Sequence, residues 1–175
     1  MPKVDVHYAD YVKPMFELMS TTGILLVSNN PQGRPNPMTI GWGTVGVVWG
    51  RPMFVALVRP SRYTYECLEH SGDFTINVQP KDRKDWVDLC GSVSGRDRDK
   101  LAELGLTAVP AKHVSTPIIK ECRIHYECRV VHHNDIILGN LEEDIISEYY
   151  PERDHHRVYY GQILRSCIEK GLPKP

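Results

Sequence analysis

The stretch that decides the fold reads NPMTIGWG over residues 36–43, passes through Trp49-Gly50-Arg51-Pro52, and ends in VRPSRYT over residues 58–64. We interpret it as a strand, a glycine-rich bend, a second strand and a basic turn that opens a helix. The apolar run Met53–Val58 is typical of a buried strand. The turn after that run leads into a helix predicted over residues 61–70.

The basic turn carries the residue types of an anion-binding site. A helix N-terminus has unpaired N–H groups and a partial positive charge, and guanidinium groups bind phosphate through paired N–H donors. The sequence therefore predicts a phosphate site at this turn, and the alternative is a solvated turn with surface arginines. The candidate residues are Arg59, Ser61, Arg62, Tyr63 and Thr64.

Short strands are predicted on both sides of the deciding stretch. Ile24–Ser28 is an apolar run closed by a turn with proline and glycine, and residues 36–43 should pair with it as a hairpin. In the strand predicted over Phe74–Val78 the apolar side chains face inward, whereas Thr75 and Asn77 face solvent.

The second half of the chain is predicted to mix helices and strands. Helices are expected over Arg83–Cys90, ended by a glycine, and over Asp99–Leu104, with Asp97 as the N-cap. From Ile118 the alternation predicts a long, half-buried strand, and Arg123, His125, Glu127 and Arg129 lie on the face that points outward. Strands over Ile136–Leu141 and Val158–Leu164 complete the sheet. Near the N-terminus, Tyr11–Met19 is interpreted as a strand or an irregular lead-in, because Pro14 disfavours a helix interior.

Composition places the chain among ordinary globular proteins. With 175 residues, 41% hydrophobic residues and a net charge of −1, we expect one domain over residues 1–175 and no nucleic-acid partner. The apolar runs are too short to span a membrane, and the N-terminus lacks a secretory pattern, so a cytoplasmic location is expected. The five cysteines contain no Cys-x-x-Cys pair and are expected to stay reduced.

Four segments together resemble one known family. NPMTIGWG, VRPSRYTYE (residues 58–66), DFTINV (residues 73–78) and SGRDRDK (residues 94–100) are similar, in order and spacing, to the flavin reductase-like, FMN-binding split-barrel family, which includes flavoredoxins. The resemblance covers about Ile24 to Ile163. It implies a mainly β fold with a few helices, an antiparallel split β-barrel of Greek-key type, and a homodimer with cofactors at the subunit boundary.

The resemblance also implies a cofactor site, with FMN as the cofactor and FAD as the alternative. The basic turn would hold the flavin phosphate, with a contribution from the loop that contains Lys100. The glycine-containing strand would present its backbone to the flavin ring, because small residues let a backbone approach closely. For Trp42, Lys100, Asn77 and His156 a structural or surface role is the alternative. Besides the basic turn, the implied residues are Met38, Thr39, Ile40, Gly41, Trp42, Asn77, Ser94, Gly95, Lys100, His156 and Tyr160.

Other site types are disfavoured by the sequence. The letters Gly41-Trp42-Gly43-Thr44-Val45-Gly46 match a dinucleotide fingerprint but run into apolar sequence rather than a helix, so no Rossmann domain is expected. Neighbouring histidines on a strand point to opposite faces, so the doublets His132-His133 and His155-His156 predict no metal site. Two functions remain open. One is an oxidoreductase that passes electrons from NAD(P)H through FMN to a flavin or another acceptor; the other is a flavoredoxin-like carrier serving a redox protein. No catalytic acid or base is expected in either.

Overall fold

The computed structural model describes residues 2–175 and is built around one antiparallel sheet. Eight strands form this sheet, in the order β3-β2-β6-β9-β10-β5-β4, with β1 added to β10. The strands of the sheet are β1 (Lys3–Asp5), β2 (Ile24–Asn29), β3 (Pro35–Ile40), β4 (Gly43–Val48), β5 (Arg51–Val58), β6 (Asp73–Val78), β9 (Ile124–Asp135) and β10 (Arg157–Glu169). A separate pair is formed by β7 (Ala108–Val109) and β8 (Ile118–Ile119).

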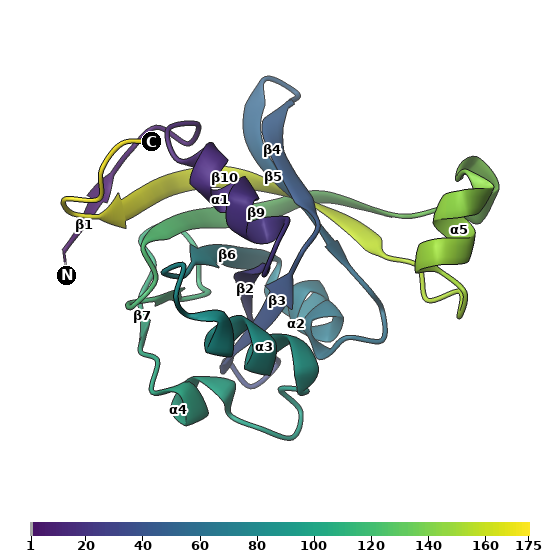
Figure 1. Cartoon of the computed structure of the whole chain (residues 1–175), viewed down its shortest axis with the longest axis horizontal. Coiled ribbons are helices and arrows are strands. Elements are labelled where there is room, and N and C mark those ends of the chain that lie inside the picture. Colours follow the sequence, from purple (N-terminus) through teal and green to yellow (C-terminus); the bar gives the residue numbers. More distant parts are fainter. Residues whose placement is uncertain (1) are drawn as a thin grey trace.

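Five α-helices and one short 3-10 turn lie around the sheet (Figure 1). In Figure 1, α3 and α4 lie below the β2–β3 hairpin, and α5 sits at the far end of the long β9–β10 arm. The β4–β5 hairpin projects from the opposite side, and both termini lie near β1. The helices are α1 (Val12–Met19), α2 (Tyr63–Ser71), α3 (Lys84–Ser92), α4 (Lys100–Leu104) and α5 (Glu143–Tyr149), with the 3-10 turn η1 at Leu138–Asn140.

Two apolar clusters cover the two faces of the sheet. The larger cluster fills the inside of the curled sheet, where Leu26 and Phe54 are fully buried. The smaller one lies between the outer face of β2 and the helices α3 and α4, with Leu25 and Val27 pointing into it. Strand β2 is therefore buried on both faces, which explains its continuous apolar sequence.

The N-terminal segment differs from its prediction, because Val12–Met19 is the helix α1. Pro14 is its third residue, within the first turn, where the missing N–H has no helical partner to lose. Met15, Leu18 and Met19 then place one face of the helix in the core. The expectation of a strand or an irregular lead-in was wrong because the position of the proline within the helix decides its effect.

The expected outward face of β9 is also wrong for its first residues. His125 and Glu127 are fully buried, as is Asn77 on the neighbouring strand β6. The segment before β8 covers this face, and the backbone N–H groups of Lys112 and His113 donate to Glu127 at 3.0 and 2.7 Å. Arg165 completes the site through an ion pair with Glu127 at 2.7 Å. The alternation of apolar and polar residues thus predicted the strand correctly. It could not show that segments distant in sequence cover the polar face of the strand.

Three further predictions need correction at element ends. Residues 136–141 hold the 3-10 turn η1 rather than a strand, and α5, which follows them, was not predicted. Helix α3 continues through Gly91 to Ser92. The N-cap of α4 is Asp99, whose side chain accepts from the Ala102 N–H at 3.1 Å, and not Asp97.

Within residues 2–175, no helix is both long enough and apolar enough to cross a membrane. Across the same residues, His, Cys, Asp and Glu side chains nowhere gather in a group of three or more that could hold a metal ion.

Candidate functional site

Two adjoining hollows lie along strand β3, and most of the predicted site residues line one or both. The first, called here the loop pocket, has a volume of about 290 Å³ and lies between β3, the start of α2 and residues 90–96. The second, called the strand pocket, has about 210 Å³ and lies between residues 38–42, the end of β5 and His156. Met38, Thr39 and Arg62 line both pockets, so the two form one continuous site.

The loop pocket offers two cations to an anion. The guanidinium of Arg62, the N-cap residue of α2, makes no hydrogen bond or ion pair with any of residues 2–175. Lys100 is only 4% exposed, and its Nζ lies 3.4 Å from the carbonyl oxygens of both Cys90 and Val93. Burial lowers the pKa of Lys100, and the nearby Cys90 and Cys67 thiols offset part of that effect. A buried ammonium with two long contacts is suited to a charged acceptor.

One wall of the loop pocket is a close contact between Gly95 and Asn36. The Asn36 Nδ2 donates to Thr64 Oγ1 at 2.9 Å, whereas its Oδ1 is buried without a partner in the described part of the chain. A Cβ atom at position 95 would lie only 2.0 Å from this Oδ1. Only glycine lets the loop approach so closely, and the unpaired oxygen is free to accept from a bound hydroxyl or amide.

Two residues of the predicted phosphate site are engaged elsewhere. The Arg59 guanidinium donates to the carbonyl oxygens of Asp154 and Tyr149 at 2.7 and 2.8 Å, and it stacks over the Tyr150 ring. The Ser61 hydroxyl donates to the Asp154 carboxylate at 2.5 Å. These contacts hold the segment after α5 against the turn. Arg59 and Ser61 therefore line the site but stabilise its wall, because Asp154, far away in sequence, comes close to them.

Residues 38–42, which the resemblance assigned to one site, all line the strand pocket. The Thr39 hydroxyl donates to the Val87 carbonyl at 2.5 Å and ties β3 to α3. Trp42 is 38% exposed and meets the edge of the Tyr149 ring with centroids 5.0 Å apart. Trp42 is thus part of the pocket wall, and a purely core role for it is wrong.

His156 closes the far side of the strand pocket. Its ring packs on Trp42 with centroids 4.9 Å apart, and its Nδ1 lies 2.9 Å from the Tyr150 hydroxyl. Burial lowers the pKa of His156 to about 4, and the cations Arg59 and Arg62 act in the same direction. His156 is therefore a neutral ring at pH 7, whose Nδ1 can accept a hydrogen bond from the Tyr150 hydroxyl.

Two predicted residues lie away from these pockets. Asn77 is fully buried, so the solvent-facing position expected for it is wrong; its Oδ1 accepts from the Ile119 N–H at 2.8 Å and faces His125 Nδ1 at 3.0 Å. Tyr160 packs near Trp49 of the projecting hairpin and lines neither the loop pocket nor the strand pocket. The buried network around Asn77 holds β8 and β9 together.

Several lining residues were missed by the sequence reasoning. All lie on β3, on β5 or around the end of α3, and Asn36 stands at the start of the stretch first quoted. If the predicted helix had been extended to Ser92, its last residues would have been recognised as neighbours of the SGRDRDK segment (residues 94–100). The missed residues are Asn36, Leu57, Val58, Cys90, Gly91, Ser92, Val93 and Arg96.

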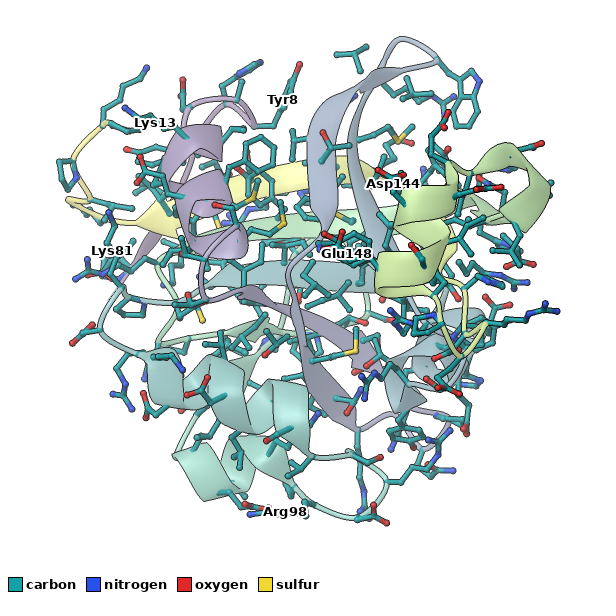
Figure 2. All side chains as sticks on the ribbon, turned by 45° about the vertical axis from the view of Figure 1, so that its right-hand side comes forward. Tyr8, Lys13, Lys81, Arg98, Asp144 and Glu148 are labelled. Carbon is teal, nitrogen blue, oxygen red and sulfur yellow. The ribbon has the colours of Figure 1, made fainter. Side chains whose placement is uncertain are left out.

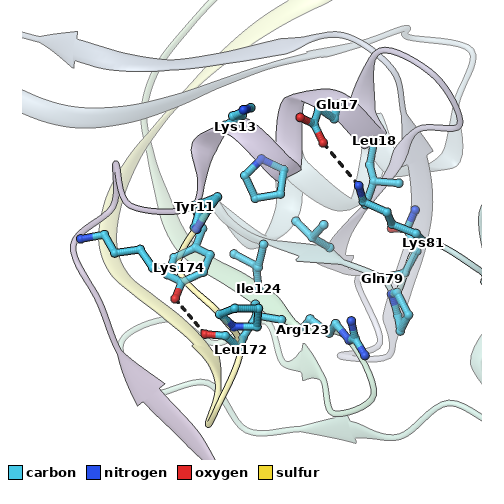
Figure 3. Close-up of a pocket in the computed structure, with 15 residues that line it drawn as sticks. Tyr11, Lys13, Glu17, Leu18, Gln79, Lys81, Arg123, Ile124, Leu172 and Lys174 are labelled. Carbon is cyan, nitrogen blue, oxygen red and sulfur yellow. Dashed lines mark hydrogen bonds and ion pairs between the residues drawn. The ribbon is translucent and has the colours of Figure 1, made fainter.

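A further cavity of about 320 Å³ lies under α1 and contains none of the predicted site residues (Figure 3). Lys81 there pairs with Glu17 at 3.4 Å, and the Tyr11 hydroxyl donates to the Leu172 carbonyl at 3.2 Å (Figure 3). The Lys81 cation of this lining is therefore paired, unlike the free guanidinium of Arg62.

Comparison with known proteins decides the family. The sequence profile described as "Flavin reductase like domain" matches residues 18–173. The chain belongs to the flavin reductase-like family. Its mainly β, antiparallel fold with five helices is the split barrel of that family.

Similar proteins come from several organisms. An uncharacterized protein of Archaeoglobus fulgidus is 30% identical over 126 residues, which cover 72% of this chain and 66% of that protein. The chain thus spans slightly less than two thirds of that relative. Flavoredoxin of Desulfovibrio vulgaris has a TM-score of 0.68 at 25% identity, covering 85% of this chain and 69% of that one. An FMN-binding domain of a flavin reductase-like enzyme from Shewanella baltica has a TM-score of 0.65 at 19% identity. The match covers 95% of this chain and 77% of the Shewanella chain.

Proposed function

We propose that this flavoprotein binds FMN in the continuous site formed by the loop pocket and the strand pocket, and that it is an oxidoreductase taking electrons from NAD(P)H. The observation that supports this most is that the free Arg62 guanidinium and the buried Lys100 both line the loop pocket, which adjoins the strand pocket. A phosphate end and a ring end are the two features that an FMN site requires. The FMN-binding domain from Shewanella baltica has the same fold.

Two chain features fit the cofactor. The unpaired Asn36 Oδ1 offers an acceptor to a hydroxyl of a ligand bound in the loop pocket. Gly95 leaves no space that a side chain could fill without striking that oxygen. Arg62 and Lys100 would hold the phosphate through charge-assisted hydrogen bonds, which are roughly twice as strong as neutral ones.

The strand pocket would bind the ring by its shape and its backbone. The backbone of residues 38–42, which line this pocket, would bind the polar edge of the ring, and Gly41 adds no side chain to block it. Trp42 and the neutral His156 would limit water on one side of the ring. Bound flavin supplies the hydride and electron chemistry, so the protein needs no acid or base of its own.

A second function, an electron carrier for a redox protein, is favoured by one observation. The flavoredoxin of Desulfovibrio vulgaris matches 85% of this chain at 25% identity. Carrier and oxidoreductase use the same cofactor site and differ in the donor. No side chain in the loop pocket or the strand pocket distinguishes an electron carrier from an oxidoreductase.

The test is anaerobic stopped-flow bleaching of the bound flavin. The purified protein is loaded with FMN and mixed with NADH or NADPH, and absorbance near the flavin band is followed. Rapid bleaching by one nicotinamide supports the oxidoreductase. Bleaching by dithionite but by neither nicotinamide would instead support the carrier. A protein that titration cannot load with FMN or FAD would contradict both functions.

A further inference from the structure

The cavity under α1, called here the α1 cavity, is separate from the proposed flavin site. It has a volume of about 320 Å³ and shares no lining residue with the loop pocket or the strand pocket. Its walls come from α1, from the end of β6 and the turn after it, from the start of β9 and from residues 172–175. This volume is within the range of pockets that bind small molecules.

The walls of the α1 cavity are largely apolar. Leu18, Val78 and Ile124 line it and are buried in the core. The ring of Tyr11 lines it as well, and because the Tyr11 hydroxyl already donates to the Leu172 carbonyl, this residue offers mainly its ring surface. Four prolines add further flat faces. Flat faces of this kind suit a planar, aromatic ligand.

Gln79 gives this apolar cavity one buried polar group. The residue is 2% exposed, and its Nε2 donates to the Gly23 carbonyl at 2.8 Å. Its Oε1 is buried and has no hydrogen-bond partner among residues 2–175. A buried acceptor without a partner costs free energy, so such groups normally have a donor. A ligand that carries an O–H or N–H group would supply the missing donor.

Two cations that line the α1 cavity make no side-chain hydrogen bond. Lys13, on α1, forms no side-chain hydrogen bond or ion pair within residues 2–175, and Arg123, just before β9, approaches Glu169 only at 3.9 Å. That distance is too long for a hydrogen bond, so the guanidinium keeps its donors. In Figure 3, Lys13 lies above Ile124 and Arg123 below it. An anion in the cavity would therefore find cations at two sides.

The other charged side chains of the lining have partners or oppose one another. Lys81 pairs with Glu17 at 3.4 Å, and Lys174 pairs with Asp10 at 3.1 Å. Glu17 is the only acidic side chain among the described residues that line the cavity. In Figure 2, Lys13 and Lys81 lie on the left of the molecule, whereas α5 with its acidic residues lies on the right. The charge left for a ligand is thus positive.

We propose that the α1 cavity is a second ligand site of this protein, and that its ligand is a planar aromatic carboxylate with a hydroxyl group. The aromatic part would pack on Leu18 and Ile124, and the hydroxyl would donate to Gln79 Oε1. The carboxylate would form ion pairs with Lys13 and Arg123. A neutral aromatic compound would leave both cations unpaired. This site is independent of the proposed flavin site.

The experiment is isothermal titration calorimetry of the purified protein, with and without saturating FMN. The probe is 6-hydroxy-2-naphthoate, which has two fused rings, one carboxylate and one hydroxyl. 2-Naphthol lacks its carboxylate, and 2-naphthoate lacks its hydroxyl. We expect 6-hydroxy-2-naphthoate to bind at one site per chain in both conditions. Each of the two analogues should bind about tenfold more weakly or worse, because each loses a hydrogen-bonding group that the cavity pairs.

Variants locate the probe within the α1 cavity. The double variant Lys13→Gln with Arg123→Gln should weaken 6-hydroxy-2-naphthoate about tenfold or more, and 2-naphthol less than about twofold. The matched control is Lys120→Gln with Arg129→Gln, an exposed lysine and arginine that line neither the α1 cavity nor the flavin pockets. Leu172→Trp, which fills part of the cavity, should weaken both probes and leave FMN affinity unchanged.

Several outcomes would overturn this second site. The proposal is wrong if 6-hydroxy-2-naphthoate does not bind the wild type, or if the double variant weakens it no more than it weakens 2-naphthol. Binding that FMN abolishes would place the probe in the flavin pockets instead. Unchanged probe affinity in Leu172→Trp would place it elsewhere on the protein. Failure of FMN to bind would overturn the proposed function alone, because the titration without FMN still tests the α1 cavity.

Discussion

At the scale of single residues, the chemistry of the site depends on which side chains remain free. Arg59, Ser61 and Arg62 are neighbours in sequence and look equivalent there. In the structure, Arg59 and Ser61 are held by the segment after α5, and of the three only Arg62 makes no side-chain hydrogen bond or ion pair with residues 2–175. The sequence correctly placed this basic turn at the start of a helix. It could not predict this division of roles, because Asp154 lies more than ninety positions along the chain.

Arg62→Ala should separate the phosphate contact from the ring contact. Losing one charge-assisted hydrogen bond costs about 1.5–3 kcal/mol, or about a tenfold to hundredfold weaker affinity for FMN. Riboflavin, which has the ring but no phosphate, should bind the variant and the wild type alike. Thr39→Val, which removes the tie between β3 and α3, should weaken both ligands. The measurement is a flavin-fluorescence titration with each ligand, and equal affinities of the wild type for FMN and riboflavin would refute the anion site.

His156 should make folding stability depend on pH. Its pKa falls from 6.5 to about 4 in the folded protein, mainly through burial. Above pH 6.5 the ring is neutral in both states and contributes nothing. Between pH 6.5 and 4 the unfolded chain takes up a proton that the folded one does not, so stability falls as the pH falls. After solvent screening, the loss is expected to be about 1–3 kcal/mol.

The check for His156 is urea denaturation of the wild type and His156→Gln at several pH values. The glutamine keeps an acceptor for the Tyr150 hydroxyl but has no titrating ring. We expect the stability difference between the two proteins to shift against the wild type from pH 6.5 to 4 and to level off below. Parallel pH curves for the two proteins would show that His156 does not carry this dependence.

At the scale of elements, the loop from Val93 to Asp99 depends on a single glycine. A Cβ atom at Gly95 would meet the Asn36 Oδ1 at 2.0 Å, so Gly95→Ala should push the loop away from β3. We expect FMN affinity to fall about tenfold, equivalent to about 1.4 kcal/mol, with little change in melting temperature. Gly139→Ala, where a Cβ would meet nothing within 4 Å, is the matched control. Unchanged FMN affinity in Gly95→Ala would mean that this contact is not part of the site.

At the scale of elements, apolar sequence patterns predicted the buried strands but not the buried polar residues or helix α5. The apolar run of β2 predicted a buried strand correctly, because a strand buried on both faces must be apolar throughout. The apolar run of β5 also predicted a strand correctly, although Val55 and Leu57 on one of its faces are only half-buried. His125 and Glu127 were misplaced because polar side chains in a half-apolar pattern normally face water. Here Arg165 and two backbone N–H groups pair with Glu127 inside the protein. Helix α5, with no buried residue, left no apolar period to detect.

For the whole molecule, the surface carries exposed apolar residues where two elements project. On the β4–β5 hairpin, Val47 and Trp49 are 62% and 63% exposed, and past the end of β9 Ile137 is 65% exposed. Figure 1 shows this hairpin and the β9–β10 arm standing away from the rest of the sheet. Exposed apolar surface of this kind marks interaction sites. We propose that this surface joins two copies of the chain, as the family resemblance implies.

Trp49 gives the sharpest test of this dimer. It has a positive φ of 52° in the two-residue turn between β4 and β5, where asparagine is preferred and a bulky residue is strained. Trp49→Asn should therefore keep the hairpin, and by relieving strain it should stabilise the isolated chain by about 0.5–1 kcal/mol. Because it removes the largest exposed apolar side chain, it should also weaken self-association at least tenfold in sedimentation velocity. Val4→Thr, a partly exposed apolar residue on β1, is the control and should leave the dimer unchanged. A wild type that sediments as a monomer at micromolar concentration would contradict the dimer.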